Sequence, residues 1–321
     1  MLVVKPPGKK KIDVLGLGCA AVDDLLYVES FPLADTKVRV ARRHRRCGGL
    51  TGSALVAAAR LGARCAYAGC LGTDDLSRHI AKNFLREGVD ISHSPRLPEA
   101  RVIHSTVVIG QETGSRNIFY EVPGVAGAHP FLPADDVIRN AKVLFIDHYG
   151  MPGNLRALKR ARLFGVPVVA DFEDEAVPHF EEVLDGVDHL ILSEEFACQI
   201  TREANACDAA LALWRPTRAA VIVTCGRNGC WSVSKESGEK PRHHPAFQVR
   251  TANTSGCGDV FHGAYAFRLA CGDSLEERIR FASAAAAVKA KQSEIPSLQA
   301  VESLLRKNVR KPISTALLAV K

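Results

Sequence analysis

Residues 253–263 (NTSGCGDVFHG) combine a tight turn of small residues with a single carboxylate at the start of an apolar helical pattern. Gly256 and Gly258 let the backbone turn without a Cβ penalty, so consecutive N–H groups can point at an anion near the positive end of the helix. Asp259 is placed where it could take a proton from a hydroxyl that attacks a bound phosphate. The turn therefore fits phosphoryl transfer, although its small polar residues would also serve as ordinary helix caps.

A second glycine-bearing segment strengthens this interpretation. Gly48 and Gly49 precede the Ala-rich residues 53–62, and the sequence GCLGTDD follows at residues 69–75. Together with the late turn, these motifs resemble the ribokinase-like (PfkB) family of carbohydrate kinases. That family has a Gly-Gly segment before an Ala-rich helix, then G-x-x-G-x-D, and the motif D-T-x-G-A-G-D near the end. The order and spacing fit, and the resemblance covers nearly the full length.

The resemblance implies roles for the residues of the late turn. Asp259 would be the catalytic base that deprotonates the acceptor hydroxyl. The backbone amides of Gly256, Cys257, Gly258 and Asp259 would form an anion hole for the transferred phosphoryl group. Cys257 stands where the family motif has a small alanine. ATP would be the phosphoryl donor, with Mg²⁺ on its phosphates.

Acceptor contacts are implied by the earlier motifs. Asp23 matches a family position that hydrogen-bonds sugar hydroxyls, and Gly48 and Gly49 match the pair whose backbone approaches the sugar. Ser53 stands where the family has a sugar-contacting Asn; its hydroxyl can still donate and accept a hydrogen bond. The resemblance therefore implies a small-molecule sugar substrate, with a preference that Ser53 could alter.

Nucleotide and metal contacts follow from later segments. Residues 223–229 (VTCGRNG) resemble the nucleotide-side strand and turn of the family, which assigns Thr224, Gly226 and Gly229 to ATP. The family motif N-x-x-E, associated with magnesium, falls on Ser193-Glu194-Glu195-Phe196, so Glu194 or Glu195 would have to supply the carboxylate. Because Mg²⁺ keeps several waters, a displaced carboxylate need not abolish metal use.

One further departure concerns a monovalent cation. Asn253 replaces the Asp that begins the late family motif, and it removes a charge associated with a monovalent cation site. Activation by potassium is therefore left open.

Short apolar runs alternate with helical patterns along most of the sequence. This alternation favours an α/β fold with a mainly parallel sheet covered by helices on both faces. The resemblance makes it a ribokinase-like three-layer α/β/α fold. Ligands then bind beyond the carboxyl ends of the strands, where Asp171, residues 173–175, His148 and Tyr149 follow expected strands.

Two segments break the alternation. Residues 27–40 and 101–121 have β-rich sequence that suggests strands without helices between them. The resemblance assigns about 26–47 and 100–122 to a small β lid over the sugar, within one kinase domain spanning 1–321. Closure of such a lid would exclude water that competes for the phosphoryl group. In the family such lids often pair subunits, so we expect a homodimer.

Composition sets broad limits. The protein has 321 residues, of which 47% are hydrophobic, enough for a buried core. No stretch of about 18 uninterrupted apolar residues predicts a membrane span, and the start lacks the apolar core of a secretory signal, so we expect a cytoplasmic protein. The ten cysteines show no spacing that would suggest a zinc site.

The formal net charge of +7 is concentrated in residues 39–46, which contain five arginines. This run could meet an anionic acceptor, or it could be a solvated strand or a subunit contact. Nucleic-acid binding is not expected, because the basic run has no interleaved aromatic residues and no recognised module surrounds it.

The main prediction is an ATP-dependent sugar kinase, and three alternatives stay open. The acceptor could be a nucleoside or a sugar phosphate instead of a free sugar. The altered residues 193–196 also allow a non-catalytic ligand-binding member of the fold. Residues 16–21 (GLGCAA) formally match a dinucleotide-binding motif, with Asp35 near the acidic offset, which would indicate an oxidoreductase.

Overall fold

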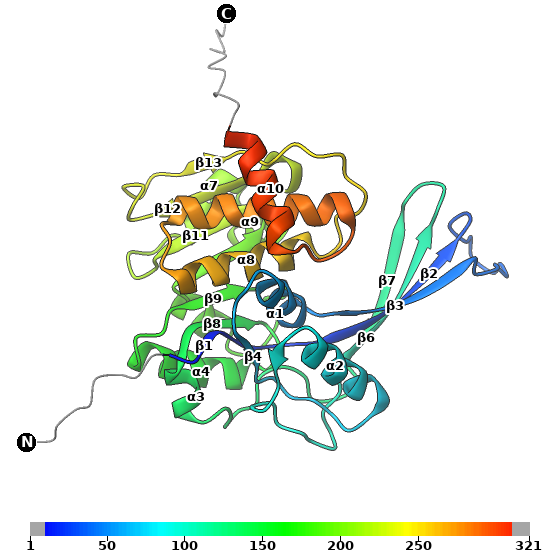
Figure 1. The fold of residues 1–321 in the computed structure, drawn as a ribbon, viewed down its shortest axis with the longest axis horizontal. Helices are drawn as coiled ribbons and strands as arrows, with labels where there is room; N and C mark the ends of the chain where they lie inside the picture. The colour runs from blue at the N-terminus through cyan, green and yellow to red at the C-terminus, as the bar shows by residue number, and fades with distance from the viewer. Residues whose placement is uncertain (1–9, 310–321) are drawn as a thin grey trace, which may run out of the picture.

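The computed structural model describes residues 10–309 and contains a main sheet with strand order β13-β12-β11-β10-β9-β8-β1-β4-β5 (Figure 1). The strands from β11 to β5 are mutually parallel, and antiparallel pairing is confined to β12 and β13 at one edge. Their bounds are β1 Ile12–Leu17, β4 Cys65–Tyr67, β5 Val89–Asp90, β8 Ala141–Asp147, β9 Val168–Asp171, β10 His189–Ser193, β11 Ala220–Thr224, β12 Cys230–Ser234 and β13 Arg242–His244.

The inner strands are nearly continuous apolar runs because both faces of the sheet are covered. In β8, Val143 and Phe145 join one core cluster, whereas Leu144 and Ile146 join the other. The first cluster includes α1 Leu50–Arg60, α2 Asp75–Arg86, α8 Cys257–Cys271, α9 Leu275–Gln292 and α10 Leu298–Val309. The second includes α3 Asp135–Arg139, α4 Met151–Leu163, α5 Phe180–Gly186, α6 Glu194–Thr201 and α7 Ala206–Leu213.

This arrangement confirms the predicted three-layer α/β/α fold. Within residues 10–309, no helix has the length and apolar character needed to cross a membrane.

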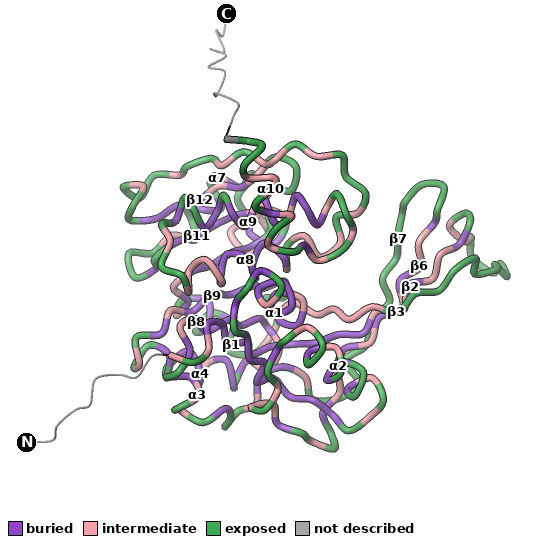
Figure 2. Tube along the Cα trace, viewed as in Figure 1, coloured by how far each residue is buried: buried purple, intermediate pink, exposed green. Residues whose placement is uncertain are grey.

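A second, four-stranded sheet has the order β3-β2-β6-β7 and projects from the body as an arm (Figure 1). Its strands are β2 Ala21–Val28, β3 Arg42–Gly48, β6 Ile103–Gly110 and β7 Arg116–Glu121. Most of the arm is exposed or half-buried, in contrast to the buried centre of the main sheet (Figure 2). The charged sequence of β3 can therefore form a strand, because its side chains stay in contact with water.

The expectation of strands over residues 27–40 was wrong in its boundaries. Strand β2 ends at Val28, and residues 29–41 lie outside the strands. Pro32 cannot donate a ladder hydrogen bond, and Asp35 has a φ of 58°, a turn conformation. Pairing resumes at Arg42, opposite Tyr27.

The dinucleotide-binding alternative was also wrong. Residues 16–21 lead from β1 directly into strand β2, so the helix that should receive a pyrophosphate at its N-terminus is absent from this part of the described residues. Asp35 lies in the exposed loop between β2 and β3. The two glycines instead permit close packing, because a Cβ at Gly18 would overlap the Asp147 carboxylate.

Candidate active site

Two helix starts meet at the centre of the site. Helix α1 follows Gly49, which has a φ of 89°, and helix α8 follows Gly256, which has a φ of 77°. Neither residue supplies a side-chain cap. The helices can approach closely because Gly263 lacks a Cβ, which would otherwise overlap the Ala54 carbonyl oxygen. Both helix starts consequently face one cavity.

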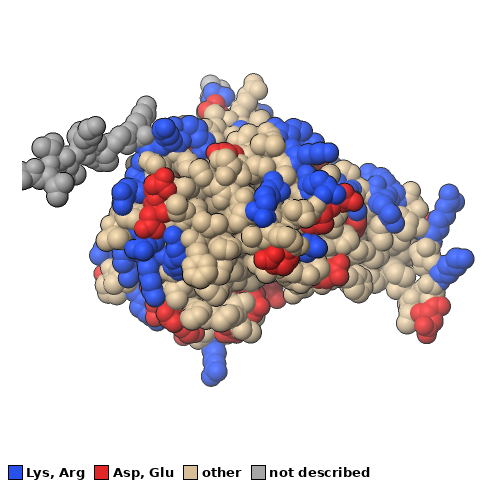
Figure 3. All heavy atoms as spheres, turned by 90° about the horizontal axis from the view of Figure 1, so that it is seen from below, with Lys and Arg blue, Asp and Glu red and all other residues tan. Residues whose placement is uncertain are grey.

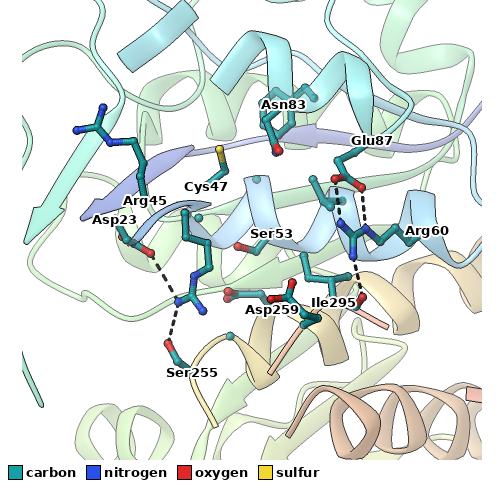
Figure 4. Close-up of a pocket in the computed structure, with 18 of the residues that line it drawn as sticks. Asp23, Arg45, Cys47, Ser53, Arg60, Asn83, Glu87, Ser255, Asp259 and Ile295 are labelled. Atoms are coloured by element: carbon teal, nitrogen blue, oxygen red, sulfur yellow. Dashed lines mark hydrogen bonds and ion pairs between the residues drawn. The ribbon is translucent and has the colours of Figure 1, made fainter. Parts of the chain in front are cut away.

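This cavity has a volume of about 640 Å³ and collects most of the predicted catalytic and acceptor residues (Figure 4). Asp23 reaches it from β2 and Ser53 from α1, while Asp259 reaches it from the first turn of α8. The backbone of Gly48, Gly49 and Gly256 also lines it. Segments far apart in sequence thus converge on one recess. Two predicted residues of the anion hole, Cys257 and Gly258, are absent from its lining. The predicted nucleotide residues and metal candidates also do not line it: Thr224, Gly226, Gly229, Glu194 and Glu195.

The start of α8 carries backbone donors without protein acceptors. Among the described residues, the amides of Gly256, Gly258 and Asp259 make no hydrogen bond, whereas the Cys257 amide donates to Thr254 O at 3.1 Å. The capping alternative does not apply, because the Asn253 side chain instead accepts from the Ser255 amide at 2.8 Å. Free amides at a helix N-terminus suit an anion.

The Asp259 carboxyl is half-buried where α8 begins. Its pKa is raised from 3.8 to about 8, chiefly by desolvation and then by the negative charges of Asp171 and Glu173. His262 and the Ser53 hydroxyl oppose the rise in part. A carboxyl with a pKa near neutrality is well matched to general base catalysis.

His262 fixes the first turn of α8 against the main sheet. Its buried ring places Nδ1 2.8 Å from Gly258 O and Nε2 3.0 Å from Ile191 O, and Asp171 Oδ2 lies 3.4 Å from Nδ1. Burial lowers the pKa of His262, although its hydrogen bonds to these two carbonyls act in the opposite direction. The imidazole therefore links the start of α8 to the ends of β9 and β10.

On the acceptor side, burial raises the pKa of Asp23, and the charge of Arg46 opposes this rise. A Cβ at Gly48 would lie 2.9 Å from Asp23 Oδ2, and one at Gly49 would lie 2.7 Å from Ala20 Cα. Gly49 is thus required by packing against the backbone, whereas at Gly48 only the Asp23 carboxylate stands in the way.

Sequence reasoning missed Asp147, the last residue of β8. Its buried Oδ2 accepts hydrogen bonds from the Cys19 amide and the Thr51 hydroxyl, both at 2.8 Å, and its Oδ1 accepts from the Tyr149 amide at 2.8 Å. Asp147 therefore holds the end of β1, the start of α1 and the end of β8 together. The sequence did contain a signal for Asp147, because this carboxylate directly follows an apolar run, as Asp171 does.

Other residues after strand ends mainly organise loops. The buried His148 accepts a hydrogen bond from the Glu173 amide at 3.3 Å. Asp174 accepts from the Ala176 amide, and Glu175 accepts from Gln199. Of this group, Asp171 and Glu173 act on the site, through their charge near Asp259.

The predicted nucleotide residues lie at the carboxyl end of β11, beyond the cavity wall. The Thr224 hydroxyl donates to Leu192 O at 3.3 Å. Gly226 begins a short 3₁₀ helix, Gly226–Asn228, and has open space where a Cβ would be. Gly229 has a packing role, because its Cβ would overlap the His244 carbonyl oxygen.

The two metal candidates occupy the first turn of α6. Ser193, which replaces the family Asn, caps this helix by accepting from the Phe196 amide at 3.2 Å. Glu194 is half-buried and Glu195 is exposed. Ser193 pairs with Thr224 in the sheet register, so Glu194 and the nucleotide residues share one sheet edge. Within residues 10–309, no three His, Cys, Asp or Glu side chains cluster to enclose a metal ion.

Comparison with known proteins identifies the family of this chain. The sequence model described as "pfkB family carbohydrate kinase" matches residues 9–297. Fructokinase-1 of Oryza sativa subsp. japonica is 28% identical, covering 91% of this chain and 96% of the relative. Ribokinase of Staphylococcus aureus is 26% identical, covering 91% and 99% respectively. The structure of Arabidopsis thaliana ribokinase complexed with ribose and ATP shares the fold, with a TM-score of 0.79 at 22% identity over 92% of this chain and 99% of that one. This chain belongs to the pfkB family of carbohydrate kinases and is therefore a phosphotransferase.

Proposed function

We propose that this kinase transfers the γ-phosphoryl group of ATP to a hydroxyl of a free sugar or close sugar derivative, with Asp259 as the catalytic base. One observation carries the proposal: Asp259, with its raised pKa, shares a cavity with Asp23, the Gly48-Gly49 backbone and Gly256, whose amide is free. Acceptor contacts, base and anion hole are all needed for direct in-line transfer.

In this mechanism Asp23 and Ser53 hold the acceptor, and Asp259 takes the proton from the attacking hydroxyl. The amides of Gly256, Gly258 and Asp259 stabilise the charge that develops on the phosphoryl oxygens. Cys257 belongs to the same turn, although its amide donates to Thr254 in this structure. Closure of the arm formed by β2, β3, β6 and β7 over the cavity would act as the lid and exclude water.

ATP and Mg²⁺ fit the carboxyl edge of the main sheet. We assign Thr224, Gly226 and Gly229 to the nucleotide, as the family motif implies. Bound Mg²⁺ would neutralise phosphate charge, and it needs only one or two protein carboxylates when it arrives with a nucleotide. Glu194 lies at the same sheet edge as the nucleotide residues. Asp171 and Glu173 are two further candidate carboxylates, since they lie close enough to Asp259 to raise its pKa.

The arm also supports the proposed homodimer. Strand β7 is exposed along its whole length and carries Ile118, Phe119 and Tyr120 with relative exposures of 53%, 59% and 66%. Large apolar side chains exposed on an edge strand often mark an interface. Light scattering that shows only a monomer at micromolar concentration would count against this assignment.

Basic side chains do not form a single field on the surface drawn in Figure 3, where Lys and Arg are interspersed with Asp and Glu. This mixed surface suits a small-molecule enzyme better than a nucleic-acid binder. The family supports a sugar as the substrate that we propose. The cytoplasm is the location that we propose from the sequence.

The decisive experiment measures Mg-ATP consumption against ketoses, aldoses, sugar acids, sugar phosphates and nucleosides, with Asp259→Asn as the matched variant. We expect activity on one acceptor class and a fall in kcat of at least about a hundredfold in the variant. Near-normal turnover by Asp259→Asn would overturn the assignment of the base. Activity only on nucleosides or sugar phosphates would replace the free-sugar acceptor, and ATP binding without turnover on any acceptor would favour the ligand-binding alternative.

A further inference from the structure

Arg46 contacts residues on both sides of the cavity, Asp23 on the acceptor side and Ser255 next to the anion hole. It lies near the end of β3, and its Nη2 is 3.8 Å from Asp23 Oδ2 and 3.3 Å from Ser255 Oγ. The dashed lines that end at Asp23 and Ser255 in Figure 4 mark these two contacts. Asp23 belongs to the acceptor side, and Ser255 immediately precedes Gly256 of the anion hole. The guanidinium thus lies between the group that would hold the acceptor and the loop that would hold the phosphoryl group.

The contacts of Arg46 leave most of its donors unused. A guanidinium has five N–H donors, yet these two long contacts are the polar contacts that Arg46 makes within the described residues. Its neighbour Arg45 shows the contrast, because it forms a bidentate pair with Asp24 at 2.8 and 2.7 Å. The Arg46 side chain is 31% exposed, so water satisfies its donors only in part. A planar cation with spare donors inside a cavity is suited to an oxyanion.

A second cation lies behind the same loop. The Lys289 side chain is buried, and its Nζ donates to Ser293 O at 3.0 Å. Its Cε would lie 3.8 Å from a Cβ placed on Gly256. Two cationic side chains therefore lie near the start of α8, and Arg46 is the one that also contacts Asp23 on the acceptor side.

Building on the proposed function, we propose that Arg46 is a further catalytic residue, which binds the oxygens of the phosphoryl group while it moves from ATP to the acceptor. In this step the acceptor oxygen forms a bond to the γ-phosphorus, the bond to the bridging oxygen of the departing ADP breaks, and the acceptor proton passes to Asp259. Arg46 exchanges no proton, since a guanidinium stays charged. Its donors stabilise the spreading negative charge.

The test compares Arg46→Gln, Arg46→Lys and Arg43→Gln on the best acceptor found for the unmodified enzyme. We expect Arg46→Gln to lower kcat by about a hundredfold with little change in the acceptor KM. Arg46→Lys should restore part of kcat, because it keeps the charge but loses the planar donor pair. Arg43 is exposed on the same strand and does not line the cavity, so Arg43→Gln controls for loss of one arginine and should keep normal kcat.

Binding measurements provide a readout that is independent of turnover. We expect Arg46→Gln to weaken binding of ADP with aluminium fluoride, which mimics the phosphoryl group in transfer, while ATP affinity stays close to normal. An unchanged kcat with a raised acceptor KM would assign Arg46 to acceptor binding and overturn the proposal, as would equal affinity of both enzymes for the mimic. Failure of the proposed function itself is distinguishable, because it would leave the unmodified enzyme inactive on all acceptors.

Discussion

The two helix starts that face the cavity use glycine for opposite reasons. At the start of α1, a Cβ on Gly49 would lie 2.7 Å from Ala20 Cα, so protein atoms already fill the space. At the start of α8, a Cβ on Gly258 would meet no atom within 4 Å. The first glycine is therefore imposed by packing, whereas the second leaves open space beside backbone donors that have no protein acceptor. Only the second arrangement leaves room beside the helix start for another molecule.

The same difference separates the glycines on the nucleotide side. Gly229 packs against the β13 backbone, while Gly226 faces open space. A glycine-rich motif consequently combines structural and functional positions, and the space around each Cβ separates them.

Gly49→Ala should produce the largest effect on folding. The added methyl would overlap backbone atoms of β2, at a cost of about 1–3 kcal/mol, and the positive φ of 89° would add about 1 kcal/mol. We expect a clear fall in the midpoint of urea unfolding. A midpoint equal to that of the unmodified enzyme would show that this helix start is less tightly packed than the structure indicates.

Gly258→Ala tests the other half of the comparison. Alanine is more favourable than glycine inside a helix by about 1 kcal/mol, so the unfolding midpoint should stay constant or rise. We nevertheless expect kcat to fall by about tenfold, because the added methyl enters space next to the anion hole. This fall is smaller than the loss expected when a donor is removed, since alanine keeps the backbone N–H. The paired measurement is urea unfolding and steady-state turnover on one preparation. A stable variant with normal kcat would remove Gly258 from the site.

Apolar periodicity predicted the layers of the fold. The family resemblance, carried by local motifs, implied that Asp23, Gly48, Gly49, Ser53 and Asp259 share one site, and these residues line one cavity. Sequence analysis misplaced the boundaries of β2 and β3, since an exposed arm with charged strands lacks the alternation that marks a half-buried strand. The prediction of strands was nevertheless right for residues 101–121, which contain β6 and the fully exposed β7.

Local sequence patterns did not identify the residues that act through contacts between distant segments. Asp147 joins three segments, and Arg46 bridges Asp23 and Ser255, 209 positions away from the latter. The partners of Asp147 and Arg46 cannot be identified from the spacing of residues in the sequence, because these contacts depend on where the fold places the arm and the helix starts. The basic run at residues 39–46 was noticed, yet its members differ. Arg43 is exposed, while Arg45 and Arg46 both line the cavity, and Arg45 is already paired with Asp24.

The smallest predicted effect concerns the contact between the two helix starts. Since Asp259 must be ionised to act as a base and its pKa is raised to about 8, kcat/KM should rise about tenfold per pH unit below that value and level off above it. Ser53 on α1 lowers this pKa, because its hydroxyl favours the ionised form of the Asp259 carboxyl. Ser53→Ala should therefore move the rising limb of the profile to higher pH, and an unmoved limb would mean that the α1 start does not tune the base.

Stability should respond to pH in the opposite direction. The folded state holds the Asp259 proton more tightly than the unfolded protein, whose carboxyl has a pKa near 3.8. This group therefore contributes stability that is fully present below about pH 4 and is lost as pH rises through about 8. Replacing the carboxyl by the uncharged amide in Asp259→Asn should make the free energy of unfolding less dependent on pH over this range. Stability and kcat/KM would thus change with pH in opposite directions, because the folded protein favours the neutral form of Asp259 while catalysis needs the ionised form. Binding of ATP and the acceptor must offset the free energy that favours the neutral carboxyl.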